Sequence, residues 1–430
     1  MNKEMRDRNI AIVGLGYVGL QVAVAFGKKE AVIAYDNNSL RIQELSEGYD
    51  RTNEVSKKDL ENKNLLFTSS LEDLKKSDFY IVAVPTPIDE FNEPDLTLLK
   101  NATASVSKTL RKNNIIVFES TVYPGATEEV CIPILEKESG LTLNEDIFVG
   151  YSPERINPGD KNHTFKNINK IVSASDKGSL KIISDAYSSV IDAEIYEAQN
   201  IKTAEAAKVI ENTQRDLNIA LINELAMLFK LMGLETSDVL EAASTKWNFL
   251  DFKPGLVGGH CVGVDPYYLT HKAKELGFDP QVILSGRKVN DSIPSFISQE
   301  IINALLAEEK KIEEVTINLL GITFKENCAD IRNSKAAEIF KILSKQVKSV
   351  NVCDHWALQE EVTNELGISL VELKDLSKAE VTIIATSHED FSSISLQKLK
   401  EITVDQGHVI DIKNVLPNSF SDSNLKIWKL

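Results

Sequence analysis

The feature that most constrains the fold is a short apolar run that ends in three spaced glycines. Residues 9–19 read Asn-Ile-Ala-Ile-Val-Gly-Leu-Gly-Tyr-Val-Gly, and a helical pattern over 18–26 follows. A predicted strand, turn and helix are therefore joined at Gly14, Gly16 and Gly19. The first glycine permits a tight turn, the second lets a ligand approach the backbone, and the third allows the helix to pack closely. The N-terminus of such a helix is suited to bind a pyrophosphate.

An acidic residue follows where a dinucleotide site requires one. The apolar run Ala-Val-Ile-Ala-Tyr ends at Asp36, about 20 residues after the glycines, where a carboxylate can accept a hydrogen bond from a ribose 2′-hydroxyl. A 2′-phosphate would be repelled at this position. The glycine pattern alone is a weak signal, but strand, helix and acid together predict a Rossmann-like domain that binds NAD.

Further β-type runs alternate with helical stretches, which is typical of a parallel sheet. These runs span 80–84, 115–119 and 147–151. Ligands of open α/β sheets bind outside the carboxyl ends of the strands, so Thr86, Thr121 and Glu154 are candidate site residues by position. The alternative is that both threonines only form turns beside proline and that Glu154 is a solvated loop carboxylate.

A long helix is predicted in the middle of the chain. Residues 200–232 contain neither proline nor glycine, are rich in Ala, Leu and Glu, and stop before Gly233. Such a helix spans about 45 Å, so we expect it to connect two lobes and to carry a dimer face. Lys208 and Asn212 share one face and could stabilise an oxyanion. Alternatively, Lys208 extends from the edge of an apolar face into solvent.

A cysteine lies in the most glycine-rich segment of the second half. Residues 255–268 read Gly-Leu-Val-Gly-Gly-His-Cys-Val-Gly-Val-Asp-Pro-Tyr-Tyr, which places Cys261 between glycines and Asp265 four residues later. This pattern favours an exposed nucleophile, because the glycines leave room for a ligand to approach the backbone. The alternative is a small hydrophobic residue in an irregular connection.

The C-terminal part has a second doubly wound pattern. A buried strand is predicted at 316–321, followed by Phe-Lys-Glu-Asn-Cys-Ala-Asp-Ile-Arg-Asn-Ser and a helix from about Ser334. Further strands are predicted at 349–354, 381–386 and 409–411. The first turn lacks the three-glycine spacing and is predicted to hold something other than a dinucleotide. Lys325 and Arg332 could bind a phosphate or a carboxylate, or could be ordinary surface charges.

Length and charge limit the remaining possibilities. The 430 residues predict an NAD-binding domain at 1–199, a central helical domain with the cysteine loop at 200–312 and a second Rossmann-like domain at 313–430. A net charge of −16 argues against nucleic acid as a partner. We expect a cytoplasmic protein without a membrane segment, because no apolar run approaches ~18 residues and the N-terminus is polar. The four cysteines and six histidines show no spacing typical of a disulfide framework or a metal site.

In combination, these motifs resemble the UDP-glucose/GDP-mannose 6-dehydrogenase family along nearly the whole chain. Seven motifs occur in the family's order, from the glycine turn through Val-Pro-Thr-Pro, Glu-Ser-Thr-Val-Tyr-Pro-Gly, Ser-Pro-Glu-Arg, Lys208 with Asn212 and the cysteine loop to Phe-Lys-Glu-Asn-x-x-Asp-Ile-Arg-Asn-Ser. The Asn-Thr-Gln-Arg-Asp-Leu-Asn and Val-Asp-Pro-Tyr-Tyr-Leu-Thr-His-Lys-Ala segments are most similar to the UDP-N-acetylhexosamine branch. That branch makes UDP-N-acetylhexosaminuronates for surface polysaccharides.

The resemblance implies a site and a partner for each ligand, and a homodimer built on the long helix. The implied NAD-binding residues are Gly14, Gly16, Tyr17, Val18, Gly19, Asp36, Arg41, Thr86, Thr121 and Arg332. The implied substrate-binding residues are Glu154, Arg155, Lys208, Asn212, Arg215, Phe252, Gly255, Gly258 and Lys325. The implied catalytic residues are Cys261, Lys208, Asn212, Asp265, Glu154 and Thr121.

The family's chemistry oxidises the sugar C6 alcohol to a carboxylate with two NAD. A thioester route needs a soft nucleophile, which Cys261 supplies, and the oxygen that gains negative charge needs partners such as Lys208 and Asn212. Asp265 or Glu154 would activate water. Some UDP-glucose enzymes have a second glutamate where this chain has Asn157-Pro158-Gly159, which disfavours UDP-glucose. UDP-GlcNAc is the favoured substrate, with UDP-GalNAc, UDP-glucose or UDP-ManNAc as alternatives.

Two other classes of protein remain to be distinguished. A nucleotide-sugar sensor without catalytic activity would keep both Rossmann-like lobes, but it would have no need for Lys208, Asn212, Cys261 and Asp265 together. A two-electron hydroxyacid dehydrogenase would share the first lobe and a long helix, but it would use neither the cysteine nor a second nucleotide-binding lobe.

Overall fold

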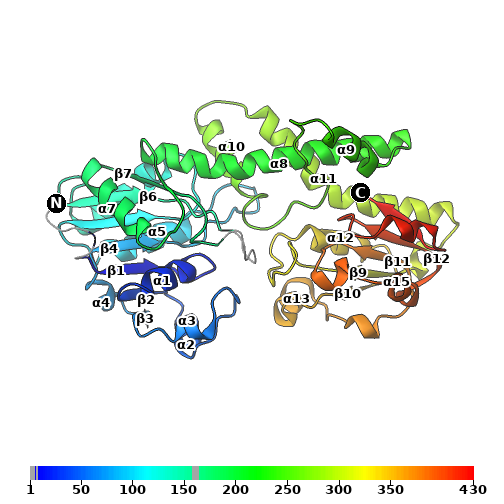
Figure 1. Ribbon diagram of the computed structural model, residues 1–430, viewed down its shortest axis with the longest axis horizontal. Coiled ribbons are helices and arrows are strands. Elements are labelled where there is room, and N and C mark those ends of the chain that lie inside the picture. The colour runs from blue at the N-terminus through cyan, green and yellow to red at the C-terminus, as the bar shows by residue number, and fades with distance from the viewer. Residues whose placement is uncertain (1–4, 6–7, 157–163) are drawn as a thin grey trace. The chain divides into compact units, whose positions relative to one another are not determined.

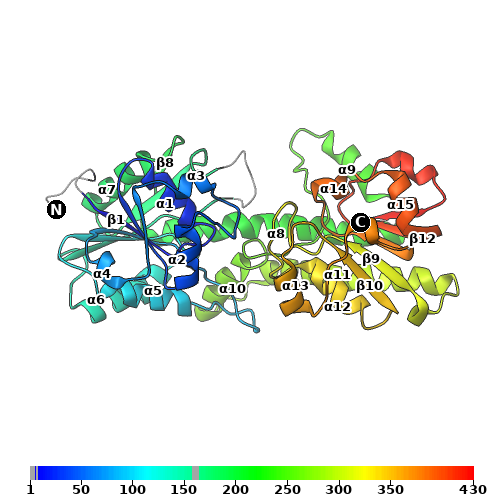
Figure 2. The ribbon, with the colours of Figure 1, turned by 90° about the horizontal axis from the view of Figure 1, so that it is seen from below.

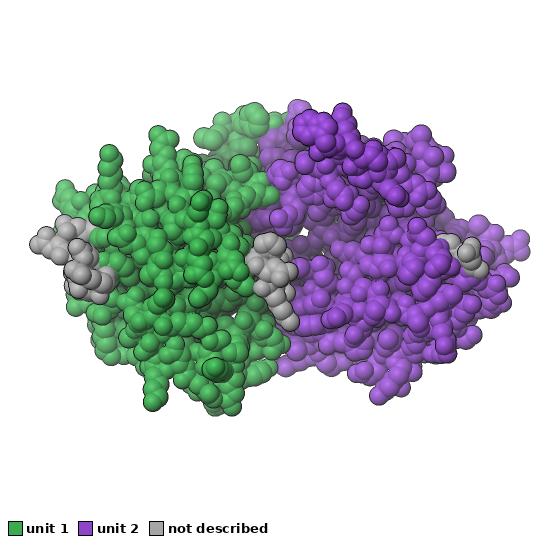
Figure 3. Space-filling model, in the orientation of Figure 1, with its two compact units in different colours: residues 1–211, 267–279 green, residues 212–266, 280–430 purple. Residues whose placement is uncertain are grey.

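The computed structural model describes residue 5, residues 8–156 and residues 164–430. The chain forms two compact units, which Figure 3 shows in different colours. Unit 1 comprises residues 1–211 and 267–279, and unit 2 comprises residues 212–266 and 280–430.

Unit 1 contains, among its described residues, a sheet with the strand order β3-β2-β1-β4-β5-β6-β7-β8 (Figure 1). The strands are β1 Ile10–Val13, β2 Val32–Tyr35, β3 Leu65–Thr68, β4 Phe79–Val82, β5 Asn114–Phe118, β6 Ile147–Tyr151, β7 Lys170–Ala174 and β8 Ile195–Glu197. Neighbouring strands are parallel, except that β6 and β7 are antiparallel. The first six strands have the order of a dinucleotide-binding sheet, which confirms the predicted Rossmann-like fold.

The helices of unit 1 connect successive strands. They are α1 Gly19–Gly27, α2 Ser39–Ser46, α3 Lys57–Leu60, α4 Leu71–Leu74, α5 Thr97–Ser107, α6 Ile132–Ser139 and α7 Lys177–Ser188, with a π-helical turn at Thr127–Cys131 before α6. The predicted helix over 18–26 is α1, and eight of its nine residues are buried. Helix α7 buries one face through residues that recur at helical spacing, and Asp176 caps its first turn by accepting from the Gly178 and Ser179 amides.

The central strands of unit 1 explain why the sequence shows continuous apolar runs. Every residue of β1, β4, β5 and β6 is buried, as expected for parallel strands covered on both faces. Burying one Ile, Val or Phe side chain of this kind contributes roughly 1.5–3 kcal/mol. The strands therefore form a rigid frame, and the polar residues that follow them are held at its carboxyl edge.

Unit 2 contains, within the described part of the chain, a parallel sheet with the order β10-β9-β11-β12-β13. The strands are β9 Thr316–Leu320, β10 Ser349–Cys353, β11 Ala379–Ile384, β12 Thr403–Asp411 and β13 Lys426–Lys429. The helices are α9 Thr236–Ser244, α11 Gln281–Ala307, α12 Lys335–Leu343, α13 Gln359–Leu366, α14 Glu389–Ser392 and α15 Leu396–Ile402, with 3₁₀ turns at Ile312–Glu314, Leu373–Asp375 and Asn418–Asp422. This is the second common doubly wound order, so the predicted second Rossmann-like sheet is confirmed.

Two helices contribute residues to both units. Helix α8 runs without a break from Ile201 to Met232, which confirms the predicted long helix (Figure 1 and Figure 2). Helix α10 covers Asp265–Glu275, and its first two residues belong to unit 2. The predicted cysteine loop immediately precedes α10.

Candidate active site

Asp36, the acidic residue that the sequence analysis linked to the glycine turn of unit 1, forms a hydrogen bond with this turn. The Gly14 amide donates to the Tyr35 carbonyl at 2.9 Å, and the Leu15 amide donates to Asp36 Oδ2 at 2.8 Å. A Cβ at Gly19 would lie 1.8 Å from the Gly14 carbonyl oxygen, whereas a Cβ at Gly16 would meet no heavy atom within 4 Å. The turn is therefore closed against α1 at Gly19 and open at Gly16, which suits a pyrophosphate.

Arg41 supports this turn from the protein interior. Its guanidinium is buried, donates to the Leu15 carbonyl at 3.0 Å and pairs with Asp50 at 2.7 Å. Asp50 in turn accepts from several neighbouring groups, so the pKa of its carboxyl is held below the ordinary value although burial alone would raise it. In this structure Arg41 fixes the backbone of the predicted NAD turn.

The two candidate threonines of unit 1 contact one another. Thr86 Oγ1 donates to the Thr121 carbonyl at 2.7 Å, which joins the segments that follow β4 and β5. The Tyr268 hydroxyl of α10 donates to the Thr86 carbonyl at 2.9 Å. The sequence therefore predicted two residues that lie together at the carboxyl edge of the sheet, and Tyr268 is an additional residue that the sequence did not indicate.

Glu154 is buried and held by its surroundings, so it is not a solvated loop carboxylate. Its Oε1 accepts from the amides of Arg155 and Ile156 at 2.6 and 2.5 Å, and its Oε2 lies 3.3 Å from Lys170 Nζ. The Arg155 guanidinium pairs with Glu211 of α8 at 2.8 Å. The Asn157-Pro158-Gly159 segment, which disfavoured UDP-glucose, lies outside the described residues.

Lys208 and Asn212 lie one turn apart on α8, and both are buried. Lys208 is 7% exposed, so it does not extend into solvent from the edge of the helix as the alternative required. Asn212 Nδ2 donates to Asp265 Oδ2 at 2.6 Å, and Asp265 is the first residue of α10. The structure thus brings together, within unit 2, an amide and a carboxylate that are 53 positions apart.

Cys261 is exposed, whereas Cys131, Cys328 and Cys353 are buried. Burial raises the pKa of Cys131 and of Cys353 to about 12, so neither thiol ionises near neutral pH. The Cys261 carbonyl accepts from the amides of Val264 and Asp265, which makes the turn that begins α10. Of the four thiols, Cys261 is the one accessible to a ligand.

The cysteine loop packs on the loop that follows β9. At Gly259 the φ angle is +81°, and a Cβ would lie 2.5 Å from the Phe324 ring; the Gly259 amide donates to the Asn333 carbonyl. His260 Nε2 lies 2.6 Å from Asp330 Oδ2. Two motifs about 70 residues apart in sequence therefore form one structure in unit 2, which Gly259 permits because it lacks a side chain.

Arg332 is engaged within the same loop. It forms a bidentate pair with Asp330, with Nε to Oδ1 at 3.0 Å and Nη2 to Oδ2 at 2.5 Å. Burial alone would raise the pKa of Asp330, but the hydrogen bonds from His260 and Arg332 outweigh it and hold the pKa well below the ordinary value. Half of the Arg332 side chain remains exposed, so it can still reach an anion. Lys325 is half-buried in this loop, and Arg215 on α8 is exposed.

The turn after β9 in the second sheet has the same hydrogen bonds as the glycine turn after β1, but its carboxylate is not accessible to a ligand. The Gly321 amide donates to the Cys353 carbonyl, and the Ile322 amide donates to Asp354 Oδ2 at 2.7 Å. Here the Asp354 side chain is completely buried and pairs with His388 at 3.0 Å. It is therefore not available to a ribose hydroxyl, in agreement with the prediction that this turn does not hold a dinucleotide.

Comparisons with known proteins agree with this arrangement. Three domain models of the UDP-glucose/GDP-mannose dehydrogenase family match the chain: the NAD binding domain at residues 8–191, the central domain at 202–292 and the UDP binding domain at 318–418. The chain belongs to this family. Its resemblance to the family was predicted from the motifs and is confirmed, and NAD is confirmed as the cofactor. The glycine turn and Asp36 lie in the NAD binding domain, and Lys325 and Arg332 lie in the UDP binding domain.

Several members of the UDP-glucose/GDP-mannose dehydrogenase family are similar over their full length. Protein CapL of Staphylococcus aureus is 52% identical over 99% of this chain and 100% of its own length. A UDP-N-acetyl-D-glucosamine 6-dehydrogenase of Pseudomonas aeruginosa is 48% identical over 98% of this chain and 100% of its own. The solved structure of a UDP-D-ManNAc dehydrogenase from Pyrococcus horikoshii has a TM-score of 0.88 and 30% identity, covering 97% of this chain and 98% of its own.

The structure also shows a buried hydrogen-bonded network of side chains in unit 2 that the sequence analysis did not predict. Asn223 of α8 holds Gly255 with both ends of its amide: Oδ1 accepts from the Gly255 amide at 2.8 Å, and Nδ2 donates to the Gly255 carbonyl at 3.0 Å. Asn290 of α11 bonds Asn223 and also Asp216, which pairs with Arg287 at 2.6 Å. One sequence feature could have indicated this network: Asn and Asp occur within apolar stretches of the helices, and buried polar groups require partners.

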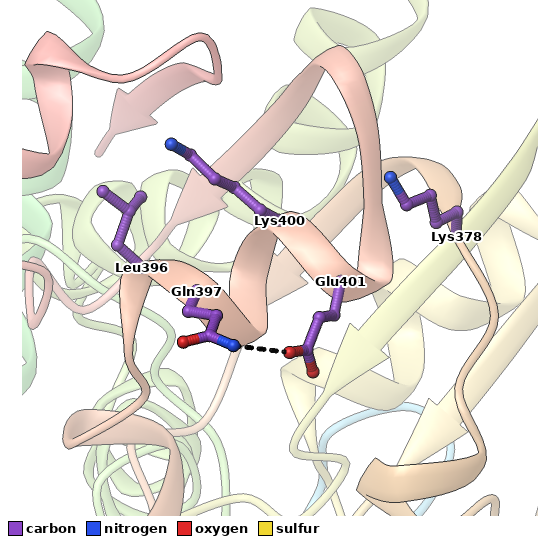
Figure 4. Close-up of a pocket in the computed structure, with 5 residues that line it drawn as sticks. All are labelled: Lys378, Leu396, Gln397, Lys400 and Glu401. Carbon is purple, nitrogen blue, oxygen red and sulfur yellow. Dashed lines mark hydrogen bonds between the residues drawn. The ribbon is translucent and has the colours of Figure 1, made fainter.

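Unit 2 also has a surface hollow, formed by residues other than those of the cysteine loop and of the loop that follows β9. It has a volume of about 470 Å³ and is lined by Lys378, Leu396, Gln397, Lys400 and Glu401 (Figure 4). These residues precede β11 and β12, at the amino ends of the strands, whereas ligands of this fold bind at the carboxyl ends. We therefore do not assign it to either ligand. Among the described residues, no helix is both long and apolar enough to cross a membrane.

Proposed function

We propose that this protein is an NAD-dependent UDP-N-acetyl-D-glucosamine 6-dehydrogenase that serves surface polysaccharide synthesis. The sugar is proposed from the 48% identity to proteins of that name from Pseudomonas aeruginosa and Salmonella typhi, each over at least 97% of this chain. The observation that carries the chemistry is the exposed Cys261 in a glycine-framed loop, next to the Asn212 and Asp265 pair.

The proposed reaction oxidises the C6 alcohol in two steps. NAD, when bound, accepts one hydride in each oxidation. In the first, the alcohol loses a hydride and a proton and becomes an aldehyde. The Cys261 thiol then adds across the carbonyl to give a thiohemiacetal, which loses a second hydride and proton to become a thioester. Water adds to the acyl carbon, the C–S bond breaks, and the products are the carboxylate, a proton and the free thiol.

Each polar residue is proposed for a role that its placement permits. Lys208 and Asn212 would stabilise the negative charge on the C6 oxygen before each hydride leaves, because buried donors interact strongly with charge. Glu154 and Asp265 would accept a proton from water. Thr121 and Thr86 would line the nicotinamide side, and Lys325, Phe252, Gly255 and Gly258 would bind the UDP moiety. Arg332 would contact both ligands, and Arg155 and Arg215 would complete the substrate site.

The proposal includes three domains, at residues 1–199, 200–312 and 313–430, and a homodimer built on α8. Exposed apolar side chains on α8 support the dimer, since Leu221, Leu228 and Leu231 recur at spacings of seven and three on one helix face. We also propose a cytoplasmic location, because NAD and nucleotide sugars are the reactants.

The test is an assay of the purified protein with NAD and four separate UDP-sugars: UDP-GlcNAc, UDP-GalNAc, UDP-glucose and UDP-ManNAc. We expect two NADH per UDP-GlcNAc and a uronate product identified by mass. Cys261→Ala should abolish the uronate, whereas Cys131→Ala, which alters a buried thiol, should retain it. Full uronate production by Cys261→Ala would overturn the mechanism, and binding of every sugar without NADH would favour a sensor.

A second substrate has one specific observation in its favour. The UDP-D-ManNAc dehydrogenase of Pyrococcus horikoshii has a TM-score of 0.88 to this chain. Its 30% identity is well below the 48% of the UDP-N-acetyl-D-glucosamine enzymes, so we place UDP-ManNAc second. A higher kcat/KM for UDP-ManNAc than for UDP-GlcNAc would reverse this order.

A further inference from the structure

Unit 1 contains a cluster of ionisable side chains that the proposed mechanism does not use. Glu119 directly follows β5, Lys170 is the first residue of β7, and Tyr187 lies on α7. All three are at most 4% exposed. They adjoin Glu154, so the cluster connects the interior of unit 1 with a proposed catalytic carboxylate.

One ammonium group is shared by two carboxylates. Lys170 Nζ lies 3.3 Å from Glu154 Oε2 and 3.4 Å from Glu119 Oε2. The Tyr187 hydroxyl donates to Glu119 Oε1, and Lys170 Nζ also lies 5.1 Å above the Tyr187 ring. The other oxygen of Glu154 is fixed by two backbone amides. Both Glu154 oxygens are therefore held, and Lys170 is the side chain that holds one of them.

The charges of the cluster depend on Glu119. With both carboxylates ionised, the buried group would carry a net negative charge, which burial disfavours. Burial raises the pKa of Glu119 to about 7, and the charge of Glu154 adds to this shift while Lys170 opposes it. The pKa of Tyr187 lies well above its ordinary value because of burial and Glu119, so Tyr187 stays neutral. Below about pH 7 the positive charge of Lys170 is thus balanced by Glu154 alone.

We infer that Lys170 and Glu119 are positioning residues that set the orientation of Glu154 for hydrolysis of the Cys261 thioester. This inference rests on the proposed function. Lys170 and the two backbone amides hold the Glu154 carboxylate in one orientation, in which it would accept a proton from water. When Glu119 also ionises, its negative charge attracts the Lys170 ammonium and fixes the group that holds Glu154 Oε2. Hydrolysis should therefore accelerate as the pH rises through the range in which Glu119 loses its proton.

The experiment separates hydrolysis from the two oxidations by rapid mixing of the full-length protein with NAD and UDP-GlcNAc. In Lys170→Met we expect an unchanged burst of two NADH per site, hydrolysis slowed roughly tenfold or more, and a covalent adduct on Cys261 in the intact mass. Lys170→Arg should recover most of the rate, because a guanidinium can pair with both carboxylates. Lys112→Met is the matched control, since Lys112 is exposed and pairs with Asp146 in the same unit.

Glu119→Gln provides an independent test that does not remove the cation. The wild-type hydrolysis rate should rise through an inflection near pH 7, and the rate of this variant should stay at the low-pH level. Stability gives a second measurement: a raised carboxyl pKa stabilises the fold fully below the ordinary value of 4.5, and this stabilisation is lost as the pH rises through about 7. The variant should not show this loss.

The outcomes distinguish the inference from the proposed function. If the wild-type protein forms no NADH with any UDP-sugar, the proposed function fails. If the wild-type protein turns over but Lys170→Met and Glu119→Gln hydrolyse with its rate and pH profile, the inference alone is overturned. A folded Lys170→Met protein that loses the NADH burst would also overturn it, because the effect would not be confined to hydrolysis.

Discussion

At the scale of single residues, two glycines in the same turn have different physical roles. Gly19 is required by packing, because a Cβ there would overlap the Gly14 carbonyl oxygen at 1.8 Å. Gly16 has open space around it, so the protein itself does not require a glycine there. The remaining reason for Gly16 is the ligand, whose pyrophosphate approaches the backbone at this point.

Substitution of each glycine by alanine should separate folding from cofactor binding. Gly19→Ala should lower the free energy of unfolding by several kcal/mol, because α1 must move away from the turn. Gly16→Ala should change it by less than about 1 kcal/mol while weakening NAD binding roughly tenfold or more. Urea unfolding and NAD titration by calorimetry measure the two effects. Equal NAD affinity in Gly16→Ala and the wild-type protein would contradict this account of the turn.

At the scale of elements, the cysteine loop is held by side chains from two helices. Asn223 of α8 and Asn290 of α11 form a buried hydrogen-bonded chain that ends on both polar groups of the Gly255 peptide. Regular secondary structure does not satisfy these backbone groups, so side chains must do so. The loop before Cys261 is therefore fixed at one end by α8 and packed on Phe324 further along.

Asn223→Ala should release this end of the loop. The substitution removes the side chain that bonds the Gly255 amide, the Gly255 carbonyl and Asn290 Oδ1 in a buried place, which costs about 1–3 kcal/mol of stability. We also expect faster alkylation of Cys261, measured by intact mass after timed exposure to iodoacetamide. Asn218→Ala is the control, because Asn218 is half-buried on the same helix and its side chain donates to the Gln214 carbonyl one turn earlier. Identical stability and identical alkylation rates in the two variants would show that the hydrogen bonds of Asn223 to Gly255 do not hold the loop.

At the scale of the whole molecule, α8 carries apolar side chains that the described residues leave exposed. Leu231 is 88% exposed, and Trp247, which follows α9, is 92% exposed. Isolated apolar residues on a surface are common, but a row along one helix face favours an interface. The proposed homodimer would cover this row with the same face of a second copy, as two-fold symmetry requires.

Leu228→Glu should shift the proposed dimer toward monomers. A charge placed in an apolar interface loses hydration without gaining a partner, so we expect dimer dissociation to increase by at least tenfold. Sedimentation velocity over a range of concentrations measures this change. Leu306→Glu alters an exposed leucine on α11 and should leave the assembly unchanged. A wild-type protein that sediments as a monomer at all concentrations would rule out the dimer.

The sequence by itself determined the features that depend on local patterns. The glycine turn, most of the apolar strands, the long helix and the cysteine loop were predicted, because each depends on local backbone conformation or on how apolar residues recur along the chain. The sequence analysis did not predict the strands β3, β7, β8 and β13. Of these, β8 has three residues, none of them buried, and β13 is only partly buried, so neither shows a periodic burial pattern. The order of the motifs then carried the resemblance that identified the family.

Only the tertiary structure decided which distant side chains share one environment. Glu119, Glu154, Lys170 and Tyr187 come from four separate segments, and of these only Glu154 was a candidate from its local sequence. Their shared burial makes one ammonium serve two carboxylates and raises the pKa of Glu119 to about 7. The physical reason is that charge interactions and desolvation depend on distance and dielectric in space, which the spacing of residues along a chain does not specify.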